Sequence, residues 1–440
     1  MRVCVVGLGK MGLPLAVHYA GRGLSVVGCD VNPAIVDAVN GGNTGMTEEP
    51  ELADRLARVR RDDLLRATID TAEAVRKSDV VLVIVQVSLD DEHRVDFSAI
   101  DAATRDIGRG LHAGTLVIYE TTLPVGSTRQ RFGPALESQS GLRAGEDFLL
   151  AFSPERVMSG SVFANLECYP KIVGGINSGS GEAAARFYTS ALTPDVKLLA
   201  SAEAAELSKL VETTYRDVNI ALANEFAQFA DFHGIDVMEV ISAANSQPYS
   251  HVHRPGLGVG GHCIPVYPHF LLAGQSTLGL PRIARGVNDG MVAYGVELLK
   301  EALGGLSGKQ VVILGLAYRE NVKETSFSCA IPLIHQLKGS GASVFLNDPM
   351  FSPEEISRYG AHPVDLDAGL EVDALVLQAY HRQYHNLDYG LFRGLRVVLD
   401  GRNVLDPALI QRLGVHYLGI GKRGVASLAG TGHVASRGIN

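Results

Sequence analysis

The chain has 440 residues, which is more than one hydrophobic core usually holds and indicates two or three domains. Hydrophobic residues make up 46% and charged residues 20% of the sequence, which excludes a disordered protein. The net charge is −9 and no long run of lysine or arginine occurs, so neither nucleic acid nor an anionic membrane surface is expected as a partner.

The cysteines are few and are not arranged as ligands. There are five of them, Cys4, Cys29, Cys168, Cys263 and Cys329, with no C-x-x-C pair. This pattern predicts neither a disulfide framework nor a metal site, and it favours a reducing compartment, the cytoplasm. The N-terminal MRVCVVGLG stops at glycines after a short apolar run, as a strand does and a secretory signal does not, and no run of about 18 apolar residues could span a membrane.

The first 200 residues predict an α/β domain. Residues 1–30 contain an apolar run, a glycine turn, a helix-compatible segment and a second apolar run, which is the pattern of a βαβ unit. Further apolar runs occur at 79–87, 115–122 and 148–155, separated by helix-compatible stretches. Such an alternation is typical of a parallel sheet covered on both faces.

Residues 201–304 predict a helical layer, in which one long helix ends at Gly234 and a second runs through 236–245. The long helix is a reasonable dimer interface, although packing within the chain explains its apolar residues almost as well. Beyond a linker at 304–309, apolar runs at 310–318, 342–349, 373–380 and 396–403 predict a second, smaller α/β domain over residues 305–422. Residues 423–440 lack periodicity, and we expect a disordered tail there.

A dinucleotide site is predicted in the first domain. The segment GLGKMG, residues 7–12, follows a strand and opens a helix, so that Gly7, Gly9 and Gly12 let the backbone approach a pyrophosphate, with Lys10 and Met11 between them. Asp30 ends the second strand, where a carboxylate binds the ribose hydroxyls of NAD and repels the 2′-phosphate of NADP. The alternative is a tight turn with a solvent-facing aspartate.

A second signal is the glycine-rich segment PGLGVGGHCIP, residues 255–265, which allows close approach to a ligand. A thiol there, near a nicotinamide, could attack an aldehyde, and oxidation of the adduct would give a thioester that water cleaves. Alternatively, Cys263 is a buried apolar residue. We predict no catalytic role for His262.

Three other positions carry suitable groups. Glu155 follows a strand end and could be a general base for hydrolysis, or merely a carboxylate at a helix N-terminus. Lys209 lies among apolar residues of the long helix, as a desolvated cation that stabilises an oxyanion or as a surface lysine. Thr121 and Thr122 end a strand and could bind the nicotinamide ribose or a water, or be structural.

Six segments together resemble a known family. They are, in order, GLGKMGLPLA, YETTLPVGST, FSPERV, AELSKLVETTYRDVNIALANEFA, PGLGVGGHCIPV and GLAYRENV. Over about residues 1–420 they resemble the UDP-glucose/GDP-mannose dehydrogenase family, nearest to its bacterial branch that oxidises UDP-N-acetylhexosamines. The resemblance implies an α/β fold of two Rossmann-like domains joined by a long central helix and a helical dimerisation layer, with NAD in the first domain, a nucleotide sugar as substrate, and a homodimer.

The resemblance also implies roles for single residues. Cys263 would be the nucleophile, Lys209 the oxyanion-stabilising residue, Glu155 the hydrolytic base, and Thr122 a cofactor or water contact. Further expected contacts are Ser88 with the cofactor, and Gly258, Gly260, Gly261, Tyr318 and Arg319 with the nucleotide sugar.

Several positions depart from the family pattern. Tyr267 stands where an aspartate is usual, Thr213 replaces an asparagine, and Tyr249 and Ser326 each replace an arginine. A Pro-Thr-Pro motif reads Gln86-Val87-Ser88. Because these residues would surround one pocket, we expect an atypical substrate that Thr213, Tyr249, Tyr267 and Ser326 help to bind.

The leading hypothesis is NAD-dependent oxidation of the C6 primary alcohol of a nucleotide sugar to a carboxylate, by two hydride transfers through a Cys-linked thiohemiacetal and thioester. A first alternative is a homologue that oxidises an atypical substrate or stops at the aldehyde. A 3-hydroxyacid dehydrogenase is disfavoured, because it lacks the second α/β unit and the GGHC segment. A non-catalytic NAD- or nucleotide-binding protein is the remaining alternative.

Overall fold

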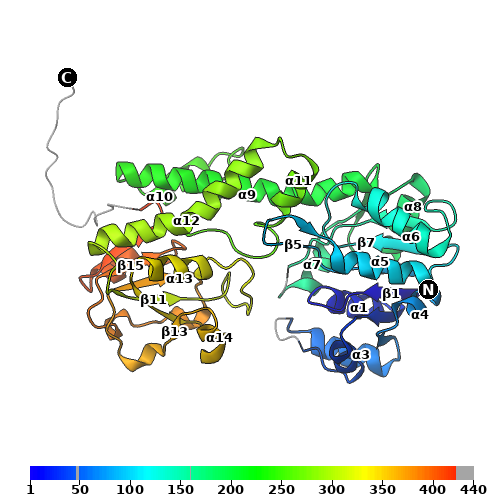
Figure 1. The fold of residues 1–440 in the computed structure, drawn as a ribbon, viewed down its shortest axis with the longest axis horizontal. Helices are drawn as coiled ribbons and strands as arrows, with labels where there is room; N and C mark the ends of the chain where they lie inside the picture. Colours follow the sequence, from blue (N-terminus) through cyan, green and yellow to red (C-terminus); the bar gives the residue numbers. More distant parts are fainter. Residues whose placement is uncertain (46–48, 159, 423–440) are drawn as a thin grey trace. The chain divides into compact units, whose positions relative to one another are not determined.

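The computed structural model describes residues 1–45, 49–158 and 160–422, so the predicted tail at 423–440 lies outside the described residues. The chain divides into two compact units (Figure 1). The first comprises residues 1–213 and 266–277, and the second comprises residues 214–265 together with the chain from residue 278 onward. The long helix α9 (Ala202–His233) contributes residues to both units. As the sequence predicts, it ends directly before Gly234, which has a φ of +69°.

The first unit is built on an eight-stranded sheet of order β10-β9-β8-β7-β4-β1-β2-β3. Its strands are β1 (Arg2–Val6), β2 (Ser25–Cys29), β3 (Leu65–Thr68), β4 (Val80–Val83), β7 (Leu116–Tyr119), β8 (Leu149–Phe152), β9 (Lys171–Gly175) and β10 (Val196–Leu198). A small antiparallel ribbon pairs β5 (Ser88–Leu89) with β6 (Val95–Asp96). The strands β2 and β3 lie on one side of β1 and β4 lies on the other, so the chain crosses over between β3 and β4, and the end of β1 is the topological switch point of the sheet.

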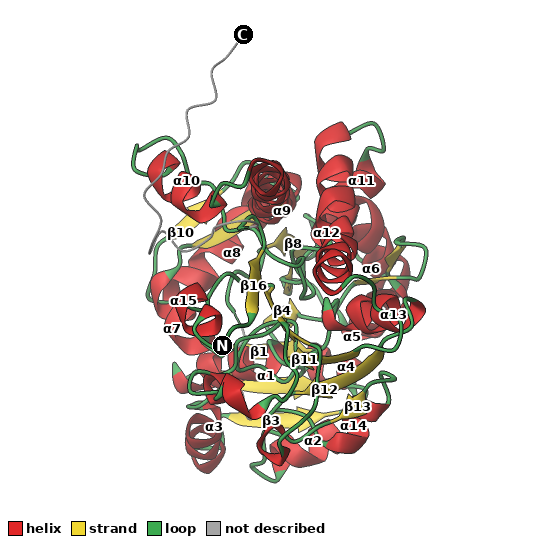
Figure 2. Ribbon diagram, turned by 90° about the vertical axis from the view of Figure 1, so that its left-hand side faces the viewer, coloured by secondary structure: helices red, strands yellow, loops and turns green. Residues whose placement is uncertain are grey.

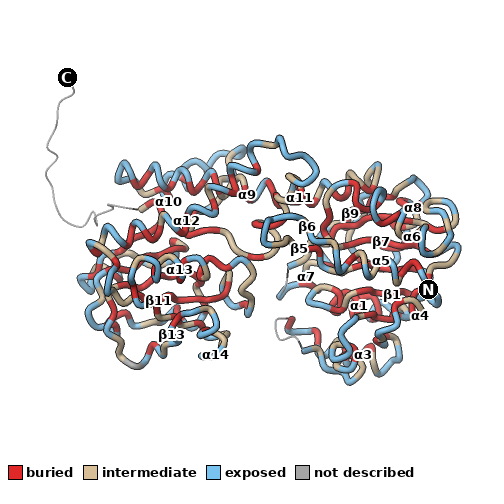
Figure 3. The backbone as a smooth tube through the Cα atoms, viewed as in Figure 1, coloured by how far each residue is buried: buried red, intermediate tan, exposed pale blue. Residues whose placement is uncertain are grey.

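Helices cover both faces of this sheet (Figure 2). They are α1 (Gly12–Gly21), α2 (Pro33–Asn40), α3 (Leu52–Arg61), α4 (Thr71–Arg76), α5 (Ser98–Gly110), the π-helix η1 (Thr128–Phe132), α6 (Gly133–Ser140), α7 (Val162–Cys168), α8 (Ser178–Ala191) and α11 (Tyr267–Gly274). Alternate strand residues enter different cores: Val3 and Val5 pack in one, and Cys4 and Val6 pack in the other. The strands are therefore buried on both sides (Figure 3), which explains their unbroken apolar sequence.

The second unit contains a six-stranded parallel sheet of order β13-β12-β11-β14-β15-β16. Its strands are β11 (Gln310–Leu314), β12 (Ser343–Asn347), β13 (His362–Pro363), β14 (Ala374–Leu377), β15 (Val397–Asp400) and β16 (His416–Gly419). Its helices, besides part of α9, are α10 (Val237–Ala244), α12 (Gly279–Leu303), α13 (Ala330–Gly339), α14 (Pro353–Ser357), α15 (Pro407–Gln411) and the 3₁₀ turns η2 (Leu366–Ala368), η3 (Arg382–Tyr384) and η4 (Tyr389–Leu391). The predicted α/β class with two Rossmann-type sheets is confirmed.

The expectation of a wholly parallel first sheet is wrong at one place, because β9 runs antiparallel to β8. The register pairs Phe152 with Gly174, and continuing it sets Lys171, the first residue of β9, opposite Glu155. A parallel β9 would begin at the opposite end of the strands, beside the amino end of β8. The reversal therefore brings a lysine to the carboxyl ends of β7 and β8.

Lys171 lies there between two carboxylates in a buried cluster. Its ammonium group is 2.9 Å from Glu120 Oε2 and 3.2 Å from Glu155 Oε2, while the Tyr188 hydroxyl donates to Glu120 Oε1 at 2.6 Å. Burial raises the pKa of Glu120. Burial also opposes ionisation of Glu155, but Lys171 and the backbone N–H groups of Val157 and Arg156 lower its pKa. The cluster thus holds the Glu155 carboxylate in its charged form.

Replacing the cation of this cluster should destabilise the first unit. Lys171→Met leaves the two carboxylates buried without their counter-charge, and removal of one partner of a buried ion pair costs about 3–5 kcal/mol. We expect a loss of this size in the free energy of unfolding measured with urea. The double variant Lys171→Met/Glu120→Gln should regain about half of it. A single variant within about 1 kcal/mol of wild type would contradict this account of the cluster.

Candidate functional site

The glycine loop of the first unit forms a tight backbone turn at the switch point of the sheet. It follows β1, and Gly7 has a φ of +95°, a conformation that side chains disfavour. A Cβ atom on Gly12 would lie 1.7 Å from the Gly7 carbonyl oxygen, whereas a Cβ atom on Gly9 would meet no other atom within 4 Å. Gly12 is therefore required by packing inside the protein, and Gly9 leaves open the space beside the loop.

Asp30 connects this loop to the end of β2. Its Oδ2 accepts the backbone N–H of Leu8 at 2.9 Å, and its Oδ1 accepts that of Asn32 at 2.9 Å. The side chain is only half-buried. The Asp30 carboxylate therefore lies against the glycine loop, and its contact with the ribose hydroxyls of NAD stays a prediction.

Thr122 and Lys209 also belong to the first unit, and both are buried. Thr122 follows β7, and Lys209 is only 8% exposed on α9. Burial favours the interpretation of Lys209 as a desolvated cation over that of a surface lysine. One turn earlier, the Glu206 carboxylate accepts the N–H and the hydroxyl of Thr128 at 2.8 and 2.7 Å, which fixes this part of α9 to the segment that follows Thr122.

The second glycine-rich segment lies in the second unit and packs on the loop that follows β11. The N–H of Gly261 donates to the Ser326 carbonyl at 2.8 Å. Cβ atoms on Gly260 and Gly261 would lie 2.8 and 2.9 Å from the Tyr318 side chain, and one on Gly258 would lie 2.8 Å from Cys329 Sγ. Arg319 donates to the Tyr318 hydroxyl at 2.9 Å. The structure thus brings together six predicted substrate contacts: Gly258, Gly260, Gly261, Tyr318, Arg319 and Ser326.

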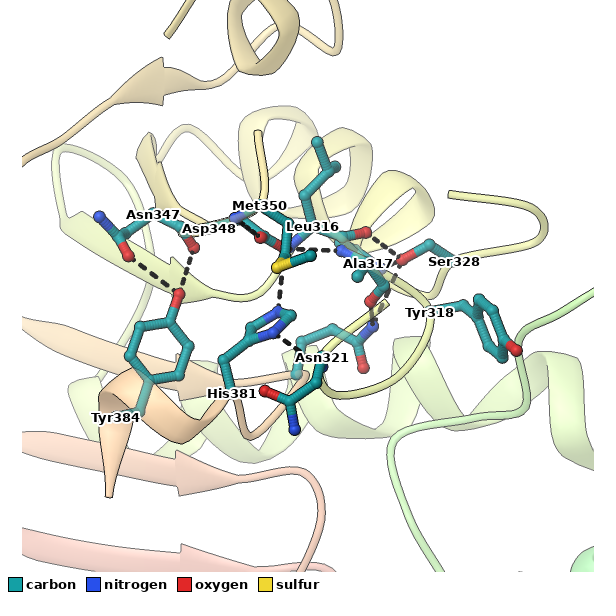
Figure 4. A network of polar contacts seen from close by, with 12 residues as sticks. Leu316, Ala317, Tyr318, Asn321, Ser328, Asn347, Asp348, Met350, His381 and Tyr384 are labelled. Atoms are coloured by element: carbon teal, nitrogen blue, oxygen red, sulfur yellow. Dashed lines mark hydrogen bonds and ion pairs between the residues drawn. The ribbon is translucent and has the colours of Figure 1, made fainter. Parts of the chain in front are cut away.

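A buried aspartate shapes the loop that carries Tyr318 and Arg319 (Figure 4). Asp348 Oδ2 accepts the N–H groups of Leu316 and Ala317 at 2.7 and 2.9 Å. His381 Nδ1 accepts the N–H of Asn321 at 3.0 Å, so a neutral ring carries its proton on Nε2, which lies 3.1 Å from Asp348 Oδ2. Burial opposes ionisation of Asp348, but the hydrogen bonds from His381 and the backbone lower its pKa.

Four further residues were predicted to contact the substrate or the cofactor, and the structure gives each of them different surroundings. The Tyr249 side chain is 91% exposed. The Thr213 hydroxyl is buried and donates to the Lys209 carbonyl of its own helix at 3.0 Å. Tyr267 begins α11 in the first unit and packs beside Phe270, with ring centroids 5.4 Å apart. Ser88 is exposed on β5.

Sequence reasoning missed several polar residues near the predicted ones. Lys171 opens the apolar segment KIVGG, and Glu120 lies two residues before Thr122. A charge inside an apolar strand sequence was the available signal for both. His262 was assigned no role, yet its Nδ1 is 2.9 Å from Glu324 Oε1, a contact across 62 residues that no local pattern indicates.

Within residues 1–45, 49–158 and 160–422, no group of three or more His, Cys, Asp or Glu side chains could hold a metal ion. No helix in this part of the chain combines the length and the apolar character needed to cross a membrane.

Sequence models of one family match most of the chain. The models of the UDP-glucose/GDP-mannose dehydrogenase family match its NAD binding domain at residues 1–192, its central domain at 203–288 and its UDP binding domain at 312–407. The prediction of NAD as the cofactor is thereby confirmed.

Individual relatives agree with this assignment. The chain is 36% identical over 431 residues to a UDP-N-acetyl-D-mannosamine dehydrogenase from Pyrococcus horikoshii, covering 96% of this chain and 99% of the relative. It is 32% identical over 419 residues to a UDP-N-acetyl-D-glucosamine 6-dehydrogenase from Pseudomonas aeruginosa, covering 92% and 97%.

Solved structures give the same result. A UDP-D-ManNAc dehydrogenase from Pyrococcus horikoshii superposes with a TM-score of 0.88 at 34% identity, covering 97% of this chain and 100% of that one. A UDP-N-acetyl-mannosamine dehydrogenase from Staphylococcus aureus superposes with a TM-score of 0.85 at 30% identity, covering 96% and 99%. The chain belongs to the UDP-glucose/GDP-mannose dehydrogenase family and carries its NAD-binding, central and UDP-binding domains in that order.

Proposed function

We propose that this protein oxidises the C6 primary alcohol of a UDP-linked N-acetylhexosamine to a carboxylate, using two molecules of NAD and one of water. The observation that carries the proposal is the GGHC segment, in which Cys263 is half-buried beside the loop of the UDP-binding domain. The names of the relatives above support an N-acetylhexosamine as the sugar. The Asp30 carboxylate and the open space beside Gly9 suit a dinucleotide without a 2′-phosphate.

We assign a role in this reaction to each predicted catalytic residue. NAD, held at the glycine loop, would supply the hydride acceptor for both oxidations. After the first, the Cys263 sulfur bonds to the aldehyde carbon and the carbonyl electron pair moves to oxygen, where the Lys209 ammonium stabilises the negative charge. The second oxidation leaves a thioester on Cys263. Glu155, ionised beside Lys171, takes a proton from the water that cleaves the thioester, and Thr122 positions that water or the cofactor.

Two of the departures from the family pattern favour a second candidate that stops at the aldehyde. Tyr267 and Thr213 carry hydroxyl groups where the resemblance leads one to expect a carboxylate and an amide, and Tyr267 packs on Phe270 while Thr213 bonds its own helix. The two candidates differ in their stoichiometry, which is two NADH per carboxylate in the first and one NADH per aldehyde in the second.

Replacing the nucleophile should separate these candidates. We expect wild type to form two NADH per sugar, followed at 340 nm, with UDP-N-acetylmannosamine or UDP-N-acetylglucosamine, and mass spectrometry to find the carboxylate. Cys263→Ser should lower carboxylate formation at least ~1,000-fold, because the hydroxyl is a far weaker nucleophile. Cys168→Ser, at an exposed cysteine, is the control. An aldehyde as the wild-type product would favour the second candidate, and no NADH with any UDP- or GDP-sugar would refute both.

Asp30 should determine the choice between NAD and NADP. Asp30→Ser removes the charge that repels the 2′-phosphate and one acceptor of the glycine loop. We expect the Kd of NADH, measured by fluorescence titration, to rise about tenfold, and the preference for NADH over NADPH to fall by a larger factor. Asp37→Ser, on the nearby helix α2, is the matched control. An unchanged preference would contradict the assigned role of Asp30.

We also propose that the protein is a homodimer formed through α9. Tyr215, Leu222, Phe226 and Phe229 recur at intervals of seven, four and three residues and so share one face of the helix, and all four are at least 43% exposed. A row of apolar side chains with heptad-like spacing is matched best by an identical row on a second copy.

A charge on this face should separate the two copies. We expect light scattering to give twice the 46.8 kDa chain mass for wild type and about the single mass for Phe229→Glu at micromolar concentration, because burying the carboxylate is unfavourable. Leu413→Glu, at an exposed leucine elsewhere in the second unit, should remain dimeric. A monomeric wild type, or a dimeric Phe229→Glu, would refute this interface.

A further inference from the structure

The residue before the predicted nucleophile is fixed by an ion pair within the second unit. His262 Nδ1 lies 2.9 Å from Glu324 Oε1, and the side chains are 35% and 10% exposed. Glu324 is itself held by backbone bonds: its N–H donates to the Val322 carbonyl at 3.0 Å, and its carbonyl accepts the Tyr318 N–H at 2.9 Å. The carboxylate is therefore positioned by the same loop against which the glycine-rich segment packs.

Hydrogen bonds to Cys263 and Glu324 raise the pKa of His262 to about 10, against the opposing effect of burial. The negative charges of the same two groups act in the same direction. On the neighbouring loop, the Arg319 guanidinium donates to the Tyr318 hydroxyl. The ring is thus a cation at neutral pH, with a carboxylate on one side and the sulfur as its other partner.

We propose that the His262–Glu324 pair keeps Cys263 in the thiolate form. The Cys263 S–H bond breaks, the proton passes to water, and the electron pair stays on sulfur, where it faces the imidazolium. Because the ring already carries both of its protons, it acts through its charge and its hydrogen bond, not as a base. Glu324 is a positioning residue that keeps the ring protonated and turned toward the sulfur.

This inference deepens the proposed function and rests on it for the use made of the thiolate. The thiolate is the form of cysteine that attacks carbonyl carbon, and a neighbouring imidazolium lowers a cysteine pKa from about 8.5 to between about 3.5 and 7.5. Within the second unit, the charged partner of the sulfur comes from the segment of Cys263 itself, and it is held by the loop after β11.

The test is the pH dependence of Cys263 alkylation in the full-length protein without substrate. Iodoacetamide is applied from pH 5 to 10, and the labelled peptides of Cys263 and of the exposed Cys168 are quantified by mass spectrometry. In wild type, Cys263 should reach half of its maximal rate below pH ~7.5, and the exposed Cys168 is the internal reference. His262→Gln, which keeps a hydrogen-bonding group without the charge, should lower the Cys263 rate at pH 6.5 at least ~10-fold and move its profile to that of Cys168.

Further variants isolate the ion pair from folding effects. Glu324→Gln should shift the Cys263 profile in the same direction by a smaller amount, and His335→Gln, at an exposed histidine of the same unit, should not shift it. Urea midpoints of all variants check their folding, and if His262→Gln is unfolded, Glu324→Gln carries the test. Wild-type half-reactivity near pH 8.5, or an unshifted profile in a folded His262→Gln, overturns the inference.

The labelling result and the catalytic result can fail separately. If the alkylation profile shifts as expected but none of the nucleotide sugars supports NADH formation, the thiolate is retained and the proposed reaction is refuted. Normal NADH formation with an unshifted profile would retain the reaction and refute the role of His262.

Discussion

In both Rossmann-type sheets, a carboxylate at the end of the second strand holds the loop that follows the first strand. Asp30 accepts the N–H of Leu8, and Asp348 accepts those of Leu316 and Ala317. Both loops open with a glycine of positive φ, so their backbone N–H groups turn toward the carboxyl end of the sheet, where these carboxylates accept them. The course of the backbone in both loops therefore depends on this interaction.

The two sheets use the interaction differently. Asp30 is half-buried, so part of its surface stays accessible to solvent. Asp348 is 3% exposed and is further bonded to His381 and to the N–H of Met350, so its hydrogen-bonding capacity is used inside the protein. The loop of the second unit also carries Tyr318, against which the glycine-rich segment packs closely because Gly260 and Gly261 have no side chain.

Local sequence patterns were sufficient to predict those strands and turns that depend on residues close together in the sequence. The apolar runs locate β1, β2, β4, β7, β8, β11, β12, β14 and β15, and the glycine loop and the end of α9 lie where the sequence places them. The strands β3 and β16, in which polar residues interrupt the apolar ones, carry weak signals, and the reversed direction of β9 depends on pairing that no local pattern contains. The same limit applies to the ion pairs: Lys171 joins Glu120 across 51 residues, and His262 joins Glu324 across 62.

The residues at two substituted positions, Thr213 and Tyr267, take part in local hydrogen bonding and packing. Thr213 bonds a carbonyl of its own helix, and Tyr267 packs on Phe270, so both contribute to the folded core of the first unit. In the second unit, the residue before Cys263 is fixed in a similar way, because His262 lies 2.9 Å from Glu324 of the same unit. The surroundings of the proposed nucleophile thus depend on a contact between segments that are 62 residues apart in the sequence.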